Sequence, residues 1–338
     1  MASVGISEVA RLAGVSTATV SRALSGRGAV SAATKQRVEI AAAELDYVVS
    51  SNASSLASGR TRNIGVLLPV LDRWYFTSVL SGAQRALLHA GYDLTLYSLD
   101  GSGSERTQVF EHFLLRQRVD AVIAVSLELS PQEVSRLHEL RKPVVGIGGP
   151  IPGVPTVSID DIAIATLATE HLLALGHTRI GHIGGAPEFD ADFHLPRQRQ
   201  QGYEEALRAA DLAPDPRIIR NADFTTEGGY RAAKQLLGLP SRERPTAIFA
   251  ASDEMAIGAM LAARDLGLEV PGELSVVGVD DHDLAEFFGL TTVAQFPREQ
   301  GAHAVSMLLE ELESGAPQLD SLMQFELRVR SSTIRPRP

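Results

Sequence analysis

The segment GISEVARLAGVSTATVSRALSG, residues 5–26, sets the fold of the first part of this 338-residue chain. Its first apolar residues recur at i, i+3, i+4 and i+7, which predicts one buried face on a short helix that ends at Gly14. Ser16 is a good N-cap, and the same spacing recurs from Val20 to Leu24 on a second helix. Two short helices joined by a glycine-bearing turn of about three residues form a helix-turn-helix, whose second helix enters the major groove of DNA.

The outer face of the predicted second helix carries side chains that can reach DNA. Arg22 has the fork geometry for guanine O6 and N7, and the methyl group of Ala18 can meet a thymine methyl. Hydroxyl side chains suit contacts with phosphates, which position the helix without reading the sequence. The candidate DNA contacts of this region are Ser16, Thr17, Ala18, Thr19, Ser21, Arg22 and Ser31.

Composition separates a basic head from an acidic remainder. Residues 1–62 carry seven Lys and Arg against four acids, the rest carries 24 against 37, and the formal net charge of the chain is −10. This split indicates that only the head meets a polyanion. The absence of cysteine excludes disulfides and thiolate catalysis. Glu8 and Arg11 interrupt the apolar run that a signal peptide needs, and no stretch approaches the ~20 apolar residues of a membrane span, so we expect a cytoplasmic protein without a membrane partner.

Beyond a third helix that begins after Ser31, the chain alternates short apolar runs with amphipathic stretches of helical length. Nearly continuous apolar runs are typical of parallel strands buried on both faces, and the stretches between them supply the crossovers. The predicted strands are 64–69, 92–98, 119–125, 143–148, 179–185, 246–252 and 274–280. Because so many strands exceed one comfortable sheet, we predict two doubly wound α/β lobes after an all-α head.

The residues quoted above carry a resemblance to a known family. ISEVARLAGVSTATVSRALSG, VSAATKQRVEIAAAELDY, LASGRT and IGVLLP closely resemble the lactose-repressor (LacI/GalR) family of bacterial regulators, and the match runs essentially from end to end. It implies a DNA-binding domain at 1–49, a hinge at 50–62 and an effector-binding, dimerising body at 63–338 with a periplasmic-binding-protein-like fold. Lobe 1 is expected at about 63–159 and 293–322, and lobe 2 at about 160–292 and 323–332.

The hinge segment SSNASSLASGRT, residues 50–61, is too short and too poor in apolar residues to form a stable helix alone. In the resembled family it pairs with its dimer mate in the minor groove, where a leucine at the position of Leu56 wedges a base step. The resemblance adds Tyr47, Ala53 and Leu56 to the candidate DNA contacts. The usual proline and asparagine after Tyr47 are replaced by Val49 and Ser50.

The body carries polar and aromatic residues just after several predicted strands, where open α/β sheets bind their ligands. A carboxylate, a guanidinium, hydroxyls and aromatic faces together suit a polyhydroxylated ligand such as a sugar. The alternative is that the aromatics pack between the lobes and Asp280 only caps a helix. The candidate effector contacts are Trp74, Tyr75, Phe76, Ser126, Arg199, Phe224, Ser252, Asp253 and Asp280.

The resemblance extends into this body through RQRQQGYEEAL, HLLALGHTRIGHIGG, AASDEMAIGAM and LSVVGVDDHD. By position, Arg199, Phe224, Ser252 and Asp280 fall where the family places effector contacts, with Tyr75 and Phe76 on the other lobe. The family's usual Asp and Asn near 70 and 73 are replaced by Val70 and Arg73, and Trp74 replaces a proline. These departures alter the wall that lobe 1 contributes.

The spacing of the residues argues against a metal site and against a dinucleotide site. The histidines 171, 177 and 182 and the run DDHD at 280–283 do not converge as metal ligands must, and the glycine-rich GIGGPIPG at 146–153 lacks the helix that would hold a dinucleotide. We therefore expect no metal, no cofactor and no enzyme. The predicted function is a homodimeric repressor that binds pseudo-palindromic operator DNA under the control of a small effector, a sugar. The alternatives are a regulator corepressed by a purine or other metabolite and a sugar-binding transport protein.

Overall fold

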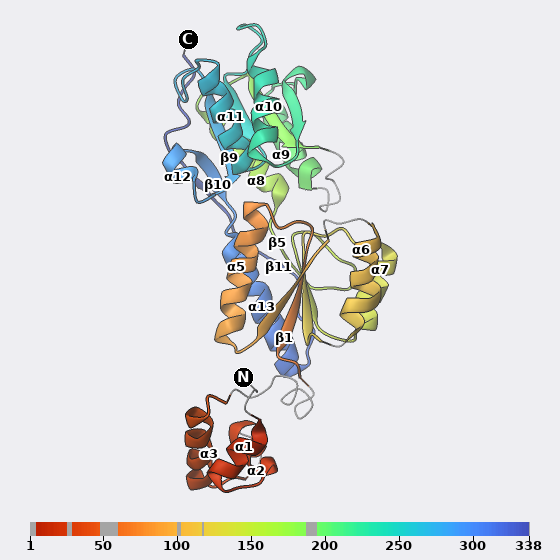
Figure 1. Ribbon diagram of the computed structural model, residues 1–338. Helices are drawn as coiled ribbons and strands as arrows, with labels where there is room; N and C mark the ends of the chain where they lie inside the picture. The colour runs from red at the N-terminus through yellow and green to blue at the C-terminus, as the bar shows by residue number, and fades with distance from the viewer. Residues whose placement is uncertain are drawn as a thin grey trace. The chain divides into compact units, whose positions relative to one another are not determined.

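The computed structural model describes residues 5–25, 29–47, 60–99, 103–116, 118–186 and 195–337 (Figure 1). The chain divides after Arg62 into two units, a head and a body. Each unit has a hydrophobic core of its own. The two units are therefore described separately.

The head is the predicted helix-turn-helix followed by a third helix: α1 Ile6–Ala13, α2 Thr17–Ser25 and α3 Ala32–Glu44. Gly14 adopts the left-handed conformation, with φ of 64°, that ends α1 without the strain a side chain would cause. Val9, Val20 and Val38, one from each helix, are completely buried at the centre of the head. The apolar spacing of residues 5–26 therefore predicted both the turn and the buried face.

The body contains two six-stranded sheets, which confirms the prediction of two doubly wound lobes. The strands are parallel except β12, which runs antiparallel to β10. Sheet 1 has the order β11-β5-β4-β3-β1-β2, with strands β1 Asn63–Leu68, β2 Asp93–Ser98, β3 Ala121–Val125, β4 Val144–Ile147, β5 Thr156–Ser158 and β11 Ser321–Leu322. Sheet 2 has the order β12-β10-β9-β8-β6-β7, with strands β6 Ile180–Gly185, β7 Ile219–Ala222, β8 Ala247–Ala250, β9 Ser275–Asp280, β10 Thr291–Ala294 and β12 Glu326–Arg328.

Helices cover both faces of each sheet, which is why the strands are apolar throughout. On lobe 1, α5 Trp74–His89 packs beside α13 Pro297–Ser314 on one face, and α6 Gly103–Gln108 and α7 Pro131–Glu139 lie on the other (Figure 1). On lobe 2, α8 Asp161–Ala174 pairs with α9 Leu195–Ala209, and α10 Thr226–Leu237 with α11 Asp253–Asp265. Short helical turns complete the body at Val109–Phe113, Leu114–Arg116, Pro216–Ile218 and α12 Ala285–Phe288.

The chain passes between the lobes three times. It leaves β5 for α8, leaves β10 for α13, and leaves β11 for β12. Sheet 2 includes β10 up to Ala294, two residues beyond the boundary expected at 292. In each sheet the first strand of the lobe has the second strand on one side and the third on the other: β2 and β3 flank β1, and β7 and β8 flank β6. Doubly wound sheets bind ligands at such switch points, beyond the carboxyl ends of the strands.

Candidate functional site

The first candidate site is the outer face of α2 in the head. Thr17, Ala18 and Arg22 are exposed there, whereas Val20 and Ala23 are buried against the other two helices. Arg22 bends back along the helix, where its Nε donates to the carbonyl oxygen of Ala18 at 3.2 Å. The helix therefore presents to solvent the side chains that the sequence predicts as base contacts.

The hydroxyl groups predicted as phosphate contacts also hold the helices. Ser16 Oγ accepts from the backbone N–H of Thr19 at 3.2 Å, and Ser31 Oγ accepts from the backbone N–H of Thr34 at 3.3 Å. Such N-caps stabilise a helix by about 1 kcal/mol each. Ser21 is half-buried, and Tyr47 packs against the head core. Ala53 and Leu56 of the expected hinge lie outside the described residues.

The second candidate site is a cavity of about 220 Å³ in the body, which we call the interlobe cavity. Lobe 1 contributes residues that follow β1 and β3, and lobe 2 contributes residues of α9 and residues that follow β7, β8 and β9. This is the position at which two doubly wound sheets bind a ligand. The lining residues are Pro69, Val70, Arg73, Tyr75, Phe76, Ser126, Leu195, Arg199, Asp223, Phe224, Ser252, Glu254, Asp280 and Gln295.

The structure brings most of the predicted effector residues into this cavity. Those that line it are Tyr75, Phe76, Ser126, Arg199, Phe224, Ser252 and Asp280. Trp74 and Asp253 do not line it. Asp223, Glu254 and Gln295 also line the cavity and were not predicted, although the first two adjoin a predicted residue in the chain. Arg73, predicted only as a change in the wall of lobe 1, lines it as well.

Arg199 is the main cationic group of the cavity and is almost completely buried. Its Nε donates to Asp161 Oδ1 at 2.8 Å, and its Nη1 donates to the carbonyl oxygen of Ala251. A guanidinium has five N–H donors in a fixed fork, so these two bonds leave donors for a ligand. Asp161 fixes the direction of the fork because it is itself buried on α8.

Asp280 lies at the end of β9, in the same lobe as Arg199, and also lines the cavity. Its Oδ1 accepts from Gln295 Nε2, and its Oδ2 accepts from the backbone N–H of Asp253 at 3.4 Å. Asp280 therefore does cap α11, as the alternative interpretation held, but it lines the cavity as well. Burial raises the pKa of Asp280 above its ordinary value, and the charge of Arg199 acts in the opposite direction.

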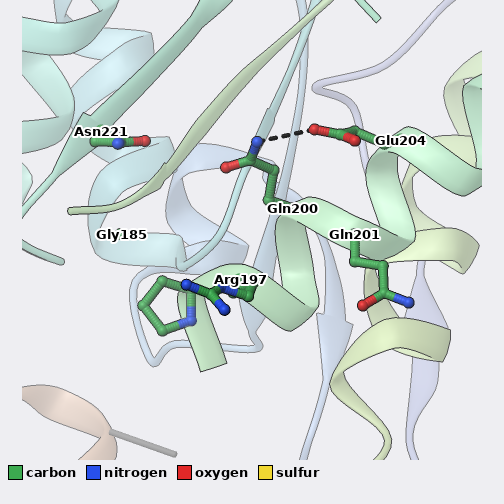
Figure 2. Close-up of a pocket in the computed structure, with 7 residues that line it drawn as sticks. Gly185, Arg197, Gln200, Gln201, Glu204 and Asn221 are labelled. Atoms are coloured by element: carbon green, nitrogen blue, oxygen red, sulfur yellow. Dashed lines mark hydrogen bonds between the residues drawn. The ribbon is translucent and has the colours of Figure 1, made fainter. Parts of the chain in front are cut away.

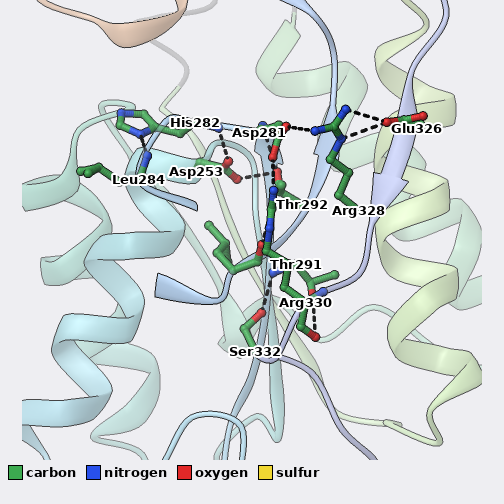
Figure 3. A network of polar contacts seen from close by, with 11 residues as sticks. Asp253, Asp281, His282, Leu284, Thr291, Thr292, Glu326, Arg328, Arg330 and Ser332 are labelled. Carbon is green, nitrogen blue, oxygen red and sulfur yellow. Dashed lines mark hydrogen bonds and ion pairs between the residues drawn. The ribbon is translucent and has the colours of Figure 1, made fainter. Parts of the chain in front are cut away.

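Asp253 has a structural position behind the cavity wall. It is completely buried, and its two carboxylate oxygens accept from Thr292 Oγ1 at 2.6 Å and from the backbone N–H of His282 at 2.8 Å (Figure 3). The neighbouring Asp281 forms ion pairs with Arg328 at 2.8 Å and Arg330 at 2.6 Å. This network ties the end of β9 to β10 and β12, so it holds Asp280 in place.

Trp74 lies at the rim and contacts lobe 2 instead of the cavity. Its indole Nε1 donates to Asp283 Oδ2 at 3.1 Å, and its ring lies 4.9 Å from that of His282. Arg298 of α13 donates to the same carboxylate at 3.1 Å. For Trp74, packing between the lobes is therefore the observed role.

Glu254 is a cavity residue with an unusual environment. It lies in the first turn of α11 in lobe 2, and Arg73 and the backbone of Trp74, both in lobe 1, act to lower the pKa of its carboxyl. Burial, together with the negative charge of Asp280, raises the pKa of Glu254 to about 7. A carboxylate held under these conditions is a candidate for ligand binding.

Three lining residues have strained backbone. Ser126, Phe224 and Asp280 have φ angles of 43°, 57° and 131°, a region that side-chain-bearing residues rarely adopt. Each such residue costs about 1–3 kcal/mol, and such strain concentrates at ligand sites. Ser126 directly follows β3, Phe224 lies two residues after β7, and Asp280 ends β9, so all three stand at the carboxyl ends of strands that border the cavity.

A separate hollow of about 270 Å³ lies on lobe 2, between α9 and β7 (Figure 2). Gln200 and Glu204 of α9 are hydrogen-bonded to each other at its edge, at 2.8 Å, and Asn221 of β7 lies on the other side (Figure 2). None of the predicted effector residues lines this hollow. It belongs to one lobe alone, so a ligand there would not join the two lobes.

Two negative findings concern the described residues. In the part of the chain that the structure describes, no group of three or more histidine, aspartate or glutamate side chains could hold a metal ion. Among the same residues, no helix is long and apolar enough to cross a membrane. The interlobe cavity and the outer face of α2 are thus the sites that gather the predicted residues.

Comparisons with known proteins cover both units. The family model described as "Bacterial regulatory proteins, lacI family" matches residues 5–50, and "Periplasmic binding protein-like domain" matches residues 169–333. The HTH-type transcriptional repressor CytR of Escherichia coli strain K12 is 36% identical over 332 residues, which cover 96% of this chain and 95% of CytR.

Two solved structures resemble the chain over nearly its whole length. The crystal structure of the lac repressor dimer bound to operator and the anti-inducer ONPF has a TM-score of 0.85 and 29% sequence identity, and covers 98% of this chain and 100% of that chain. The complex of the transcriptional regulator CelR with cellobiose has a TM-score of 0.71 and 31% identity, and covers 97% of this chain and 99% of that chain.

Proposed function

This chain belongs to the lacI family of bacterial regulatory proteins, and we propose that its hold on operator DNA is controlled by a small polyhydroxylated compound, a sugar, bound in the interlobe cavity. The chain is a DNA-binding transcriptional repressor of this family and not an enzyme. A repressor acts where the chromosome is, so the proposal places it in the cytoplasm.

The observation that carries the effector proposal is the composition of the cavity walls. Arg199, Ser252 and Asp280 offer donors and acceptors on one side, while Tyr75 and Phe76 offer aromatic faces on the other. Vicinal hydroxyls can donate to a carboxylate and accept from a guanidinium, and C–H faces pack on aromatic rings. The volume of about 220 Å³ equals the space of roughly seven water molecules, which suits a single small ring.

Control of DNA binding follows from the fact that the cavity has a wall in each lobe. A ligand that contacts both walls favours one relative orientation of the lobes over others. If operator DNA also favours one orientation, the two sites are coupled by a free energy that is typically about 1–3 kcal/mol. The coupling is reciprocal, so a sugar that weakens operator binding must itself bind more weakly to the operator complex.

The decisive experiment combines calorimetry with a DNA footprint. Purified protein is titrated with a panel of monosaccharides, disaccharides, purine bases and nucleosides, with and without a DNA fragment from upstream of its own gene. We expect a sugar to bind, and its affinity to differ between free and DNA-bound protein. Equal affinity in the two states would remove the allosteric proposal and leave DNA binding intact.

A second candidate effector is a purine or a related metabolite. The observation that favours it is the aromatic lining, because Phe76 and Phe224 approach the cavity from opposite lobes and could stack on a planar base. The Asp280 and Gln295 side chains could then pair with its polar edge. The same titration distinguishes the two, since only one class of ligand would bind.

We further propose that the active form is a homodimer on a pseudo-palindromic operator, because two identical heads read two half-sites one helical turn or a multiple of it apart. The body exposes large apolar side chains, among them Leu88, Phe287 and Leu319, that a second copy could cover. Light scattering should give about twice the 36.1 kDa of the chain. A mass of one chain at micromolar concentration would contradict this proposal.

A further inference from the structure

The charged groups of the interlobe cavity are unequal in number. Its lining includes the acids Asp223, Glu254 and Asp280 but only two bases, Arg73 and Arg199. A further acid, Asp161, lies buried behind Arg199. The cavity therefore carries an excess of negative charge when its carboxylates are ionised.

Both arginines are already paired with carboxylates. Arg199 forms a buried ion pair with Asp161 at 2.8 Å, and the charge of Asp280 also acts on it. Arg73 pairs with Asp72 at 2.7 Å in the same loop, and it also faces Asp223 and Glu254 of the other lobe. Sites for phosphate or carboxylate ligands instead offer charge-assisted donors to the anion. Here the charge of each arginine is already balanced by the protein's own acids, although Arg199 keeps N–H donors for the neutral oxygens of a ligand.

The cavity carboxylates, in contrast, keep unused acceptor positions. Each carboxylate can accept about four hydrogen bonds. Asp280 accepts from Gln295 and from the backbone of Asp253, so it retains acceptor positions for hydroxyl or ammonium donors of a ligand. Glu254, which also lines the cavity, offers further acceptor positions.

Glu254 is the member of this set that lies near lobe 1. It belongs to α11 and lines the cavity, and its carboxylate is close enough to Arg73 and to the backbone of Trp74, the first residue of α5, for both to act on its pKa. A helix N-terminus would otherwise attract an anion from the ligand. When Glu254 is ionised it supplies the negative charge there instead, so a phosphate or carboxylate on the ligand would meet a like charge.

We propose that the cavity selects effectors that are neutral or cationic and rejects phosphorylated or carboxylated forms of the same skeleton, with Glu254 as the discriminating side chain. This inference rests on the proposed function in one respect: it assumes that the effector occupies the interlobe cavity. The ligand class is then a free polyol, sugar or nucleoside rather than its phosphate ester or acid. Asp280 and Arg199 hold the hydroxyls that all these compounds share.

The first test compares matched pairs of compounds by calorimetry. The probes are ribose and ribose 5-phosphate, glucose with glucose 6-phosphate and gluconate, and adenosine with its 5′-monophosphate. Any pair with a binding member, titrated at about pH 8.5 where Glu254 is ionised, should show the neutral compound binding at least tenfold more tightly. In Glu254→Gln this ratio should shrink, because the amide keeps the shape but loses the charge. The matched control, Glu313→Gln on the exposed end of α13, should keep the wild-type ratio.

Two outcomes of this comparison would overturn the proposal. One is a phosphate ester or an acid that binds as tightly as its neutral partner. The other is a ratio that Glu254→Gln leaves unchanged, which would assign the discrimination to other groups.

The second test needs no known effector and so separates this inference from the proposed function. Thermal unfolding of the full chain is followed in inorganic phosphate and in chloride at equal ionic strength. Because phosphate is excluded from protein surfaces, we expect it to raise the midpoint only gradually, without saturation, and equally in wild type and Glu254→Gln. A saturable rise in phosphate that Glu254→Gln enhances would show that the cavity accepts anions, and the proposal would fall even if no sugar or nucleoside had been found to bind.

Discussion

The two walls of the interlobe cavity differ in chemistry although they come from lobes of the same architecture. Lobe 2 contributes charged and hydroxyl groups, among them Arg199, Glu254 and Asp280, whereas lobe 1 contributes largely apolar surface around Tyr75 and Phe76. The polar wall carries most of the groups that can hold a ligand by directional hydrogen bonds, and the apolar wall mainly covers it. We infer that lobe 2 supplies most of the effector's binding free energy and that lobe 1 converts binding into a preferred orientation of the lobes.

The largest predicted effect is on the free energy of unfolding, and it should come from breaking the ion pair behind the polar wall. Arg199→Met leaves Asp161 and Asp280 buried without their cation, and breaking a buried pair costs about 3–5 kcal/mol. We expect urea denaturation to show a loss of stability of that size. The control is Arg217→Met, whose partner Asp215 lies at the surface, and it should produce no measurable change. A loss for Arg199→Met no larger than that of the control would mean that the polar wall is not built on this pair.

The sequence predicted residues of both walls, but on different physical grounds. Asp280 and Ser252 end or follow buried strands, and the alternation of strands and helices places such residues at one edge of a sheet. On lobe 1 the candidates Trp74, Tyr75 and Phe76 are consecutive on the helix α5. Successive helical residues are rotated by about 100°, so three in a row cannot all face one cavity.

Whether the unpredicted residues reach the cavity depends on how a helix is rotated about its axis and on the presence of a short strand. Asp253 and Glu254 are the first two residues of α11, and which of them faces the cavity is set by how α11 packs, not by composition. Gln295 follows β10, a four-residue strand that the apolar pattern did not predict. The fold was thus accessible from periodicity, while the direction of individual side chains was not.

The next largest effect should be on effector affinity. Asp280→Asn removes a charge-assisted acceptor from the polar wall, and such a bond contributes about 1.5–3 kcal/mol, roughly tenfold to hundredfold in affinity. Calorimetry with the bound member of the sugar and nucleoside panel measures the loss. Phe76→Leu on the apolar wall is the comparison, and it should weaken binding less. If Phe76→Leu weakens binding more than Asp280→Asn, the apolar wall contributes more of the binding free energy than the polar wall, and the inference is wrong.

A smaller effect should appear in the dependence of stability on pH. Because the pKa of Glu254 in the folded protein is raised from 4.5 to about 7, folding favours its protonated form. Its stabilising contribution to the free energy of unfolding is therefore complete below pH 4.5 and is lost as the pH rises through about 7. The groups that face it are Asp280, Arg73 and Asp72, besides the backbone of Trp74.

The measurement is the difference in unfolding free energy between wild type and Glu254→Gln across pH 4.5–8. We expect the variant to become relatively more stable as pH rises, by on the order of 1 kcal/mol once solvent screening is allowed for. Asp253 and the buried histidines also make stability depend on pH, but both proteins contain them, so their contributions cancel in the difference. A constant difference across this range would show that Glu254 titrates near its ordinary value.

The smallest effect tests whether the two walls act independently. Tyr75 Oη donates to Gln300 Oε1 at 2.9 Å, Gln300 Nε2 donates to the carbonyl oxygen of Gln295 at 2.6 Å, and Gln295 Nε2 donates to Asp280. This chain of hydrogen bonds connects the apolar wall to the main carboxylate of the polar wall through the segment that crosses between the lobes.

Tyr75→Phe alone should weaken effector binding only slightly, by about 0.5 kcal/mol, since it removes a neutral bond that the effector does not share. In the double variant with Asp280→Asn the losses should fail to add, because the first change has already loosened the side chain on which the second acts. A double-mutant cycle by calorimetry gives this interaction free energy directly. Strict additivity would mean that lobe 1 senses the effector only through its own contacts, and the chain through Gln300 would then serve to hold the crossing segment and not to couple the walls.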